Sequence, residues 1–131
     1  MVRSFLADAA RRDIVAILAW SQEHFGADAR LRYEALLARA ISDLAENPNR
    51  AGSQDRPDIA SNAKTYHISH SRSRVSAASR RVKRPRHLLL YRVKSRGHIE
   101  ISRVLHESMD LPRHLPREYR LIQEDDPESG R

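Results

Sequence analysis

Apolar side chains recur at three- and four-residue steps along the first third of the chain, a spacing that predicts two amphipathic helices. The first helix is expected to start at Asp8, which suits the N-cap position, and to stop at Gly26, which suits the residue after a helix. The second is expected over residues 27–46, because the residue before Pro48 disfavours the helical conformation. The short link at Gly26 makes the two helices antiparallel, so their apolar stripes can pack together.

The second half of the chain has the alternating pattern and the turn residues of β-strands. Apolar residues at 88–91 and 99–105 flank the turn-forming residues 94–97. This pattern predicts a β-hairpin with strands over residues 86–93 and 98–105.

Weaker patterns predict further elements. Residues 65–70 alternate as a short half-buried strand does, and residues 2–7 are expected to form a short edge strand. Residues 47–62 are polar and are expected to form a loop between the helices and the sheet. Residues 71–85 are rich in Ser, Ala and Arg, so we expect a mobile basic loop or a short surface helix there.

These elements predict an α+β fold, in which an N-terminal helical hairpin packs on one face of a small antiparallel β-sheet. The other face of the sheet is expected to stay open. We expect one domain over residues 1–115, with the helical hairpin at about 8–46 and the sheet at about 64–106. Residues 116–131 are expected to form a flexible acidic tail that buries too little apolar surface to order itself.

Positive charge is concentrated in the β half. The chain carries 24 Lys and Arg against 17 Asp and Glu, a formal net charge of +7. Residues 64–103 hold 12 of the basic residues and a single acid, Glu100, so the remainder of the chain is net acidic. A surface of this kind attracts nucleic acid or an acidic protein, and a merely solubilising face is the alternative.

Composition argues against several classes of site. The chain has no cysteine, which excludes a disulfide framework and thiolate zinc sites. His67 and His70 would point to opposite faces of one strand and could not chelate one metal, so neither a metal nor a cofactor is expected. No apolar run approaches the roughly 20 residues of a membrane span, and the N-terminus lacks the apolar core of a signal peptide. We therefore expect a cytoplasmic protein without membrane contact.

The hairpin and its surroundings resemble a known family. Residues 83–115 read KRPRHLLLYRVKSRGHIEISRVLHESMDLPRHL. The preceding segments AARRDIVAILAWSQEHFG, LLARAISDLAENPNRAG and TYHISHSRSR supply a two-helix half and a first strand. In this order and spacing they resemble the RelE/ParE superfamily of toxins from type II toxin–antitoxin systems, and the ParE-like branch is the most similar.

The resemblance implies that the domain is a toxin of a plasmid-stabilisation-type pair, neutralised by an acidic antitoxin from the adjacent gene. ParE-like toxins inhibit DNA gyrase, and we expect this non-enzymatic activity here. One alternative is a RelE-type, ribosome-dependent and metal-independent mRNA endoribonuclease, and another is an inactive relative that only binds an antitoxin. The ending RVLHESMDLPRHL lacks the late tyrosine of the nuclease branch, which favours gyrase.

Candidate functional residues follow from the resemblance and from the basic strands. Residues expected to contact the target are Arg72, Arg86, Arg92, Arg103, His106 and Asp110. No catalytic residue is expected of a gyrase inhibitor; in a nuclease the first five would supply the cationic and acid–base groups. Residues expected to bind the antitoxin are Leu18, Trp20, Phe25, Tyr33 and Leu37.

Two of the expected target residues have competing interpretations. Arg103 alternates with apolar neighbours, and a buried guanidinium without a partner is strongly unfavourable, so we expect it to pair with Asp110. His106 either contacts the target as an acid–base group or forms a structural hydrogen bond to Asp110 or to a backbone carbonyl.

Overall fold

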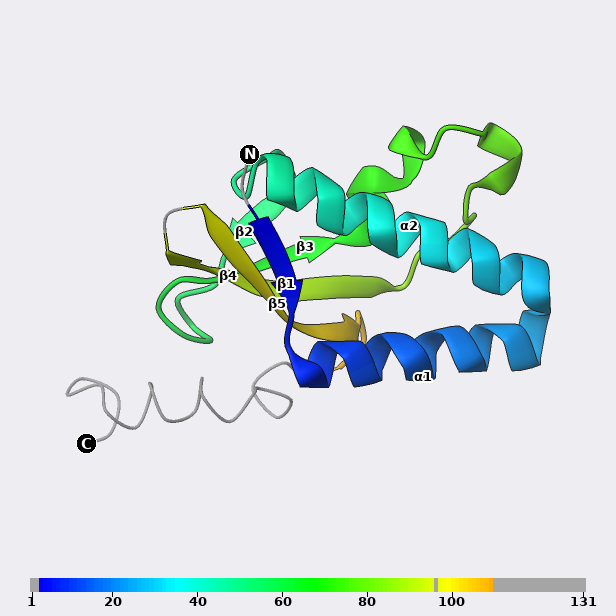
Figure 1. Cartoon of the computed structure of the whole chain (residues 1–131), viewed down its shortest axis with the longest axis horizontal. Helices are drawn as coiled ribbons and strands as arrows, with labels where there is room; N and C mark the ends of the chain where they lie inside the picture. The colour runs from blue at the N-terminus through cyan, green and yellow to red at the C-terminus, as the bar shows by residue number, and fades with distance from the viewer. Residues whose placement is uncertain (1–2, 96, 110–131) are drawn as a thin grey trace.

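The fold was analysed in a computed structural model that describes residues 3–95 and 97–109 (Figure 1). The described elements are β1 (Arg3–Leu6), α1 (Asp8–Phe25), α2 (Ala27–Glu46), β2 (Ser53–Asp55), β3 (Ala63–His67), the 3-10 helices η1 (Ile68–Arg74) and η2 (Ala78–Arg80), β4 (His87–Ser95) and β5 (His98–His106). Figure 1 shows α1 and α2 side by side and joined at one end, with the strands behind them. This arrangement confirms the predicted α+β class.

The sheet is mixed rather than purely antiparallel. Within the described residues its strand order is β1-β5-β4-β3-β2, and β1 pairs with β5 in parallel while the other neighbours are antiparallel. A parallel neighbour needs a long crossover, and everything between β1 and β5 supplies it. The sequence predicted β1 as an edge strand, but it missed β2, because Ser53–Asp55 is short, polar and without alternation.

The helices end at the residues that the sequence predicted, with one exception. Gly26 adopts a φ of 93°, a conformation that residues with a Cβ rarely take, and it separates the two helices as expected. The prediction of Asp8 as the N-cap is wrong, because Ala7 holds that position without a side-chain hydrogen bond. Asp8 instead lies in the first turn, where its charge interacts favourably with the helix dipole.

The main core lies between the helices and the sheet. Its helical residues are Ala10, Leu18, Tyr33, Leu36, Leu37, Ala40 and Leu44, and its strand residues include Tyr66, Leu89, Tyr91, Ile99, Ile101 and Val104. A second, smaller cluster contains Ile59, Ala60, Ala63, Leu90 and Leu105. Since Leu89 and Leu90 point to opposite faces of β4, this second cluster covers part of the face that was expected to stay open.

The segment after β3 differs from its prediction. The strand ends at His67, so His70 lies in η1 and the argument that both histidines share a strand does not apply. The region expected to be a mobile basic loop or a short surface helix contains the end of η1 and all of η2, but Ser71 and Val75 in it are buried. Arginine side chains brace it: Arg72 Nε donates to the Val82 carbonyl at 2.5 Å.

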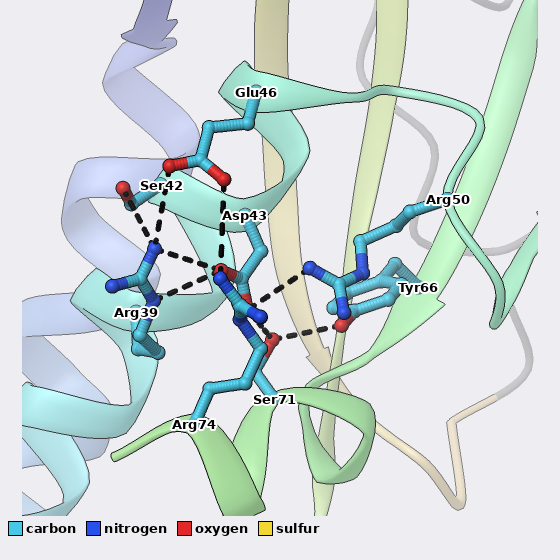
Figure 2. A network of polar contacts seen from close by, with 8 residues as sticks. All are labelled: Arg39, Ser42, Asp43, Glu46, Arg50, Tyr66, Ser71 and Arg74. Atoms are coloured by element: carbon cyan, nitrogen blue, oxygen red, sulfur yellow. Dashed lines mark hydrogen bonds and ion pairs between the residues drawn. The ribbon is translucent and has the colours of Figure 1, made fainter. Parts of the chain in front are cut away.

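A buried carboxylate joins this segment to the helical layer (Figure 2). Asp43 on α2 is fully buried and accepts a hydrogen bond from Ser71 Oγ at 2.6 Å. Arg39 Nε and Arg74 Nε each donate to its Oδ1 at 2.9 Å. Arg50 Nη1 lies 3.3 Å from Oδ2, the oxygen that Ser71 contacts. Donors from α2, from the following turn and from η1 therefore meet at one carboxylate.

The donors decide the ionisation of Asp43. Burial alone would raise its pKa, but the hydrogen bonds from Ser71 and Arg74 and the charges of Arg39 and Arg50 outweigh burial. The pKa of Asp43 therefore lies below its ordinary value of 3.8. The carboxylate stabilises the fold at pH values above that range, and this contribution is lost as the pH falls through the lowered pKa.

We expect Asp43→Ala to lower the free energy of unfolding by about 3 kcal/mol, because it leaves cationic side chains around an empty buried site. The matched control is Glu46→Ala: Glu46 is 54% exposed, and its contacts to Arg39 and Arg74 are 3.8 and 3.9 Å long. An exposed pair of this kind contributes less than about 1 kcal/mol. Urea denaturation of the two variants compares them, and equal losses would contradict the role given to Asp43.

Candidate functional site

A cluster of polar side chains lies at one end of the sheet. His67 ends β3, His87 begins β4 and His106 ends β5. The strand register pairs His87 with His106 and places His67 opposite Leu88, so the three imidazoles sit on neighbouring strands at the same end. Arg86 and Glu107 lie beside them in the chain, and we refer to these five residues as the sheet-end cluster.

Glu107 is the acidic centre of the sheet-end cluster. One of its carboxylate oxygens lies 2.9 Å from His67 Nε2, and the other accepts from Arg86 Nη1 at 3.2 Å. Its backbone N–H also donates to the Arg86 carbonyl at 2.8 Å. The hydrogen bond from His67, followed by the one from Arg86, holds the pKa of Glu107 below its ordinary value. The carboxylate is therefore charged at neutral pH and neutralises part of the local positive charge.

His87 is held as a neutral imidazole. The Tyr33 hydroxyl accepts the Arg86 backbone N–H at 3.0 Å and forms a hydrogen bond with His87 Nδ1 at 2.6 Å. Burial, followed by the charges of His106 and His67, lowers the pKa of His87 from 6.5 to about 4.

His106 makes local hydrogen bonds. Its Nδ1 accepts the backbone N–H of Ser108 at 3.1 Å and lies 2.7 Å from Ser108 Oγ, and its ring meets the His87 ring edge-on at 5.3 Å between centroids. Because Nδ1 accepts, the proton of neutral His106 is on Nε2. Among the described residues His106 bonds to Ser108, and the hydrogen bond expected to Asp110 lies outside them.

Of the described residues expected to bind the target, the structure brings together Arg86 and His106 at the end of the sheet. Arg72 lies in η1, and Arg92 lies opposite Glu100, with Nε 3.4 Å from the carboxylate. Arg92 is 8% exposed, so it presents little surface. Asp110 lies outside the described residues.

Among the described residues Arg103 pairs with Asp13, whereas Asp110, the partner expected from the sequence, lies outside them. Arg103 Nε and Nη2 donate to the two oxygens of Asp13 at 2.7 and 2.9 Å, and the Val104 backbone N–H donates to the same carboxylate at 2.9 Å. The physical reason lies in the sheet. β1 pairs with residues 98–101 of β5, so the backbone N–H of a later β5 residue, Val104, needs an acceptor from outside the sheet. Asp13 on α1 supplies it.

The residues expected to bind the antitoxin divide into two groups. Leu18, Tyr33 and Leu37 are buried in the main core, so they present little surface to a partner. Trp20 and Phe25 are 54% and 69% exposed. For these two, antitoxin binding stays a prediction.

Sequence reasoning missed His67, His87 and Glu107 as members of a site, and it expected Tyr33 to contact the antitoxin rather than His87. The available signal was their position, because histidines at the ends of consecutive strands meet when the strands pair without a shift there. Within residues 3–95 and 97–109, no group of three or more His, Cys, Asp or Glu side chains could hold a metal ion. No helix in the same residues is long and apolar enough to cross a membrane.

Comparison with known proteins links this arrangement to a family. Residues 5–111 match the family described as "ParE toxin of type II toxin-antitoxin system, parDE". The protein named "Toxin ParE1" from Mycobacterium tuberculosis, in strains CDC 1551 / Oshkosh and ATCC 25618 / H37Rv, is 31% identical over 115 residues, which cover 86% of this chain and 97% of the relative. The solved structure "Chromosomal ParDE TA system from P. aeruginosa" has a similar fold, with a TM-score of 0.59 at 18% identity over 81% of this chain and 96% of that one.

We expect acidification to destabilise the protein through His87. Its pKa of about 4 in the folded chain lies below 6.5, so the unfolded chain binds the proton more tightly and stability falls as the pH drops from about 6.5 towards 4. The loss should be on the order of 2 kcal/mol, allowing for partial exposure of the ring. Thermal unfolding at pH 5 and pH 7 measures it.

His87→Gln should flatten this pH dependence, whereas His24→Gln, at an exposed position on α1, should leave it unchanged. A slope that persists in His87→Gln would assign it to another group.

Proposed function

Because the chain belongs to the ParE toxin family of type II toxin–antitoxin systems, we propose that it acts by binding its target rather than by catalysis, and that this target is DNA gyrase. Family membership makes the chain the toxin component of a pair whose other member is an antitoxin. The identity of the target and the binding mode are what the proposal adds.

One observation carries the choice of binding over RNA cleavage. A nuclease needs a cationic group directed at the phosphate and an acid–base pair on either side of it. The four arginines that the sequence suggested for this role are each engaged by an oxygen atom of the protein: Arg72 by the Val82 carbonyl, Arg86 by Glu107, Arg92 by Glu100 and Arg103 by Asp13. Arg72, Arg92 and Arg103 are therefore committed to the fold, whereas the Arg86 side chain is 51% exposed and keeps a surface for contact.

The proposed contact surface is the sheet-end cluster together with the basic loop that precedes β4 in the chain. Lys83 and Arg84 of this loop and Arg86 of the cluster are exposed. Exposed arginine and lysine side chains speed the approach to an acidic or DNA-bearing target and contribute specificity at the contact. Arg86 and His106 are the expected target residues that this surface retains.

A ribonuclease is kept as the second candidate because the sheet-end cluster contains three imidazoles near an arginine. Imidazole is the side chain best suited to proton transfer near neutral pH. His87 is poorly placed for this role, since its Nδ1 is occupied by Tyr33 and its pKa is lowered to about 4. His67 or His106 would have to act instead. A relative that only binds an antitoxin is the third candidate.

We expect the full-length chain to inhibit DNA supercoiling by purified gyrase and to leave messenger RNA intact on purified ribosomes. Adding the product of the adjacent gene should reverse the inhibition. Arg86→Ala should raise the inhibitory concentration roughly tenfold, as loss of a central interface arginine commonly does. The matched control is Arg30→Ala, which removes an exposed arginine on α2 whose nearest acid, Glu34, is 4.0 Å away.

Different failures have different meanings in this experiment. Cleavage of ribosome-bound RNA that is lost in His106→Ala would replace the proposal with the ribonuclease. Binding to the antitoxin with no effect on gyrase or ribosomes would favour the inactive relative. Equal effects of the two arginine variants on gyrase would remove the sheet end as the contact surface.

A further inference from the structure

The basic loop that precedes β4 comprises residues 75–86 and carries a dense positive charge. Five of residues 80–86 are Arg or Lys, and none is acidic. Arg80, Lys83 and Arg84 are exposed, and none of the three forms an ion pair within the part of the chain that the structure describes. The fold therefore leaves three cations of one loop for a partner of opposite charge.

Two other arginines hold the backbone of the basic loop. Arg72 Nε donates to the Val82 carbonyl at 2.5 Å. Arg81 donates to the carbonyls of Val75 at 3.1 Å and Ser73 at 2.9 Å. Val75 belongs to the main core, and Val82 packs against it. The loop is thus braced before a partner arrives, so less conformational entropy is lost when it binds.

The exposed side chains of the basic loop suit phosphate groups better than the surface of a protein. Protein interfaces are centred on aromatic or large apolar side chains, and the exposed ones in the described chain all lie outside residues 75–86. Arg, Lys and Ser are among the side chains that contact phosphate and sugar in complexes with nucleic acid. The described residues of the loop that are exposed are Ser76, Ala78, Arg80, Lys83, Arg84 and Arg86.

We propose that the basic loop binds the phosphate backbone of double-stranded DNA. Proteins that hold single strands without sequence preference stack the bases on aromatic side chains, and residues 75–86 contain none. A duplex needs only cations directed at its phosphates. The choice of DNA over duplex RNA rests on the proposed function, because gyrase acts on DNA. Arg86 belongs to both the basic loop and the sheet-end cluster, so it links the DNA contact to the protein contact.

Binding through the basic loop is independent of DNA sequence and depends strongly on salt. The helix in this loop, η2, has three residues and cannot lie along the major groove to read base edges. Three cations on phosphates release counterions, so the logarithm of the association constant should fall with the logarithm of the salt concentration with a slope of about −3. This slope is a direct measure of the number of phosphate contacts.

Fluorescence anisotropy of a short labelled DNA duplex with the full-length chain, without gyrase or antitoxin, tests the proposal. We expect a dissociation constant on the order of 10 μM at low salt. Lys83→Ala/Arg84→Ala should raise it roughly tenfold or more and make the salt slope shallower by about 2. The matched control is Arg11→Ala/Arg12→Ala, which removes two adjacent exposed arginines from α1 and should change the constant less than about twofold.

Several results would overturn the DNA contact. One is the absence of binding at low salt, and another is an equal loss of affinity in the loop variant and the α1 variant, which would assign binding to net charge alone. Tighter binding to single-stranded RNA than to duplex DNA would replace the proposed partner. A loop variant that loses antitoxin binding but keeps the DNA affinity of the parent would make the loop a protein interface. Circular dichroism establishes that each variant is folded.

A supercoiling assay with the same variants separates this inference from the proposed function. Duplex binding that depends on Lys83 and Arg84, in a chain that leaves gyrase active, would contradict gyrase as the target and support the DNA contact. Inhibition of gyrase that is equally strong in the parent and in Lys83→Ala/Arg84→Ala, with equal DNA affinities, would support the target and overturn the DNA contact. If both hold, the loop variant should need a higher concentration to inhibit gyrase.

Discussion

The fully buried carboxylate of Asp43 is the constraint on which the rest of the structure depends. A charge without exposure is tolerated only when donors surround it, and here they come from separate parts of the chain: Arg39 from α2, Arg50 from the turn after it, and Ser71 and Arg74 from η1. The carboxylate therefore holds the segment after β3 against the helical layer. It also offsets the positive charges of Arg39, Arg50 and Arg74. The loop before β4 has no such acid and remains an exposed basic surface among the described residues.

The same principle recurs at the edge of the sheet. Beyond the end of β1, Asp13 accepts hydrogen bonds from the Val104 backbone N–H and from Arg103 of β5. Glu100 on β5 forms an ion pair with Arg92 on β4. Carboxylates on α1 and β5 thus form ion pairs with two arginines of the β half. His106 and Arg86 remain together at the polar end of the sheet, the surface that we propose for target contact.

The candidate site was only partly predictable. The hairpin itself was predictable, but the pairing of His87 with His106 was not, because the predicted strands over residues 86–93 and 98–105 exclude His106 and the observed register shifts twice along the hairpin. Membership of Tyr33 could not be inferred, since it appeared as one more apolar position of α2 and its hydroxyl reaches His87 across 54 residues of sequence. Arg103 needed an acid, and the sequence offered several; only the length of β1 made Asp13 the partner.

The sequence alone determined the elements with strong local signals. Both helices, the break at Gly26, the β4–β5 hairpin and the family resemblance follow from periodicity, punctuation and motif order, which are properties of neighbouring residues. The tertiary structure alone decided the parallel placement of β1, the strand β2 and the convergence of donors on Asp43. These depend on contacts between distant segments, whose free energies no local pattern encodes.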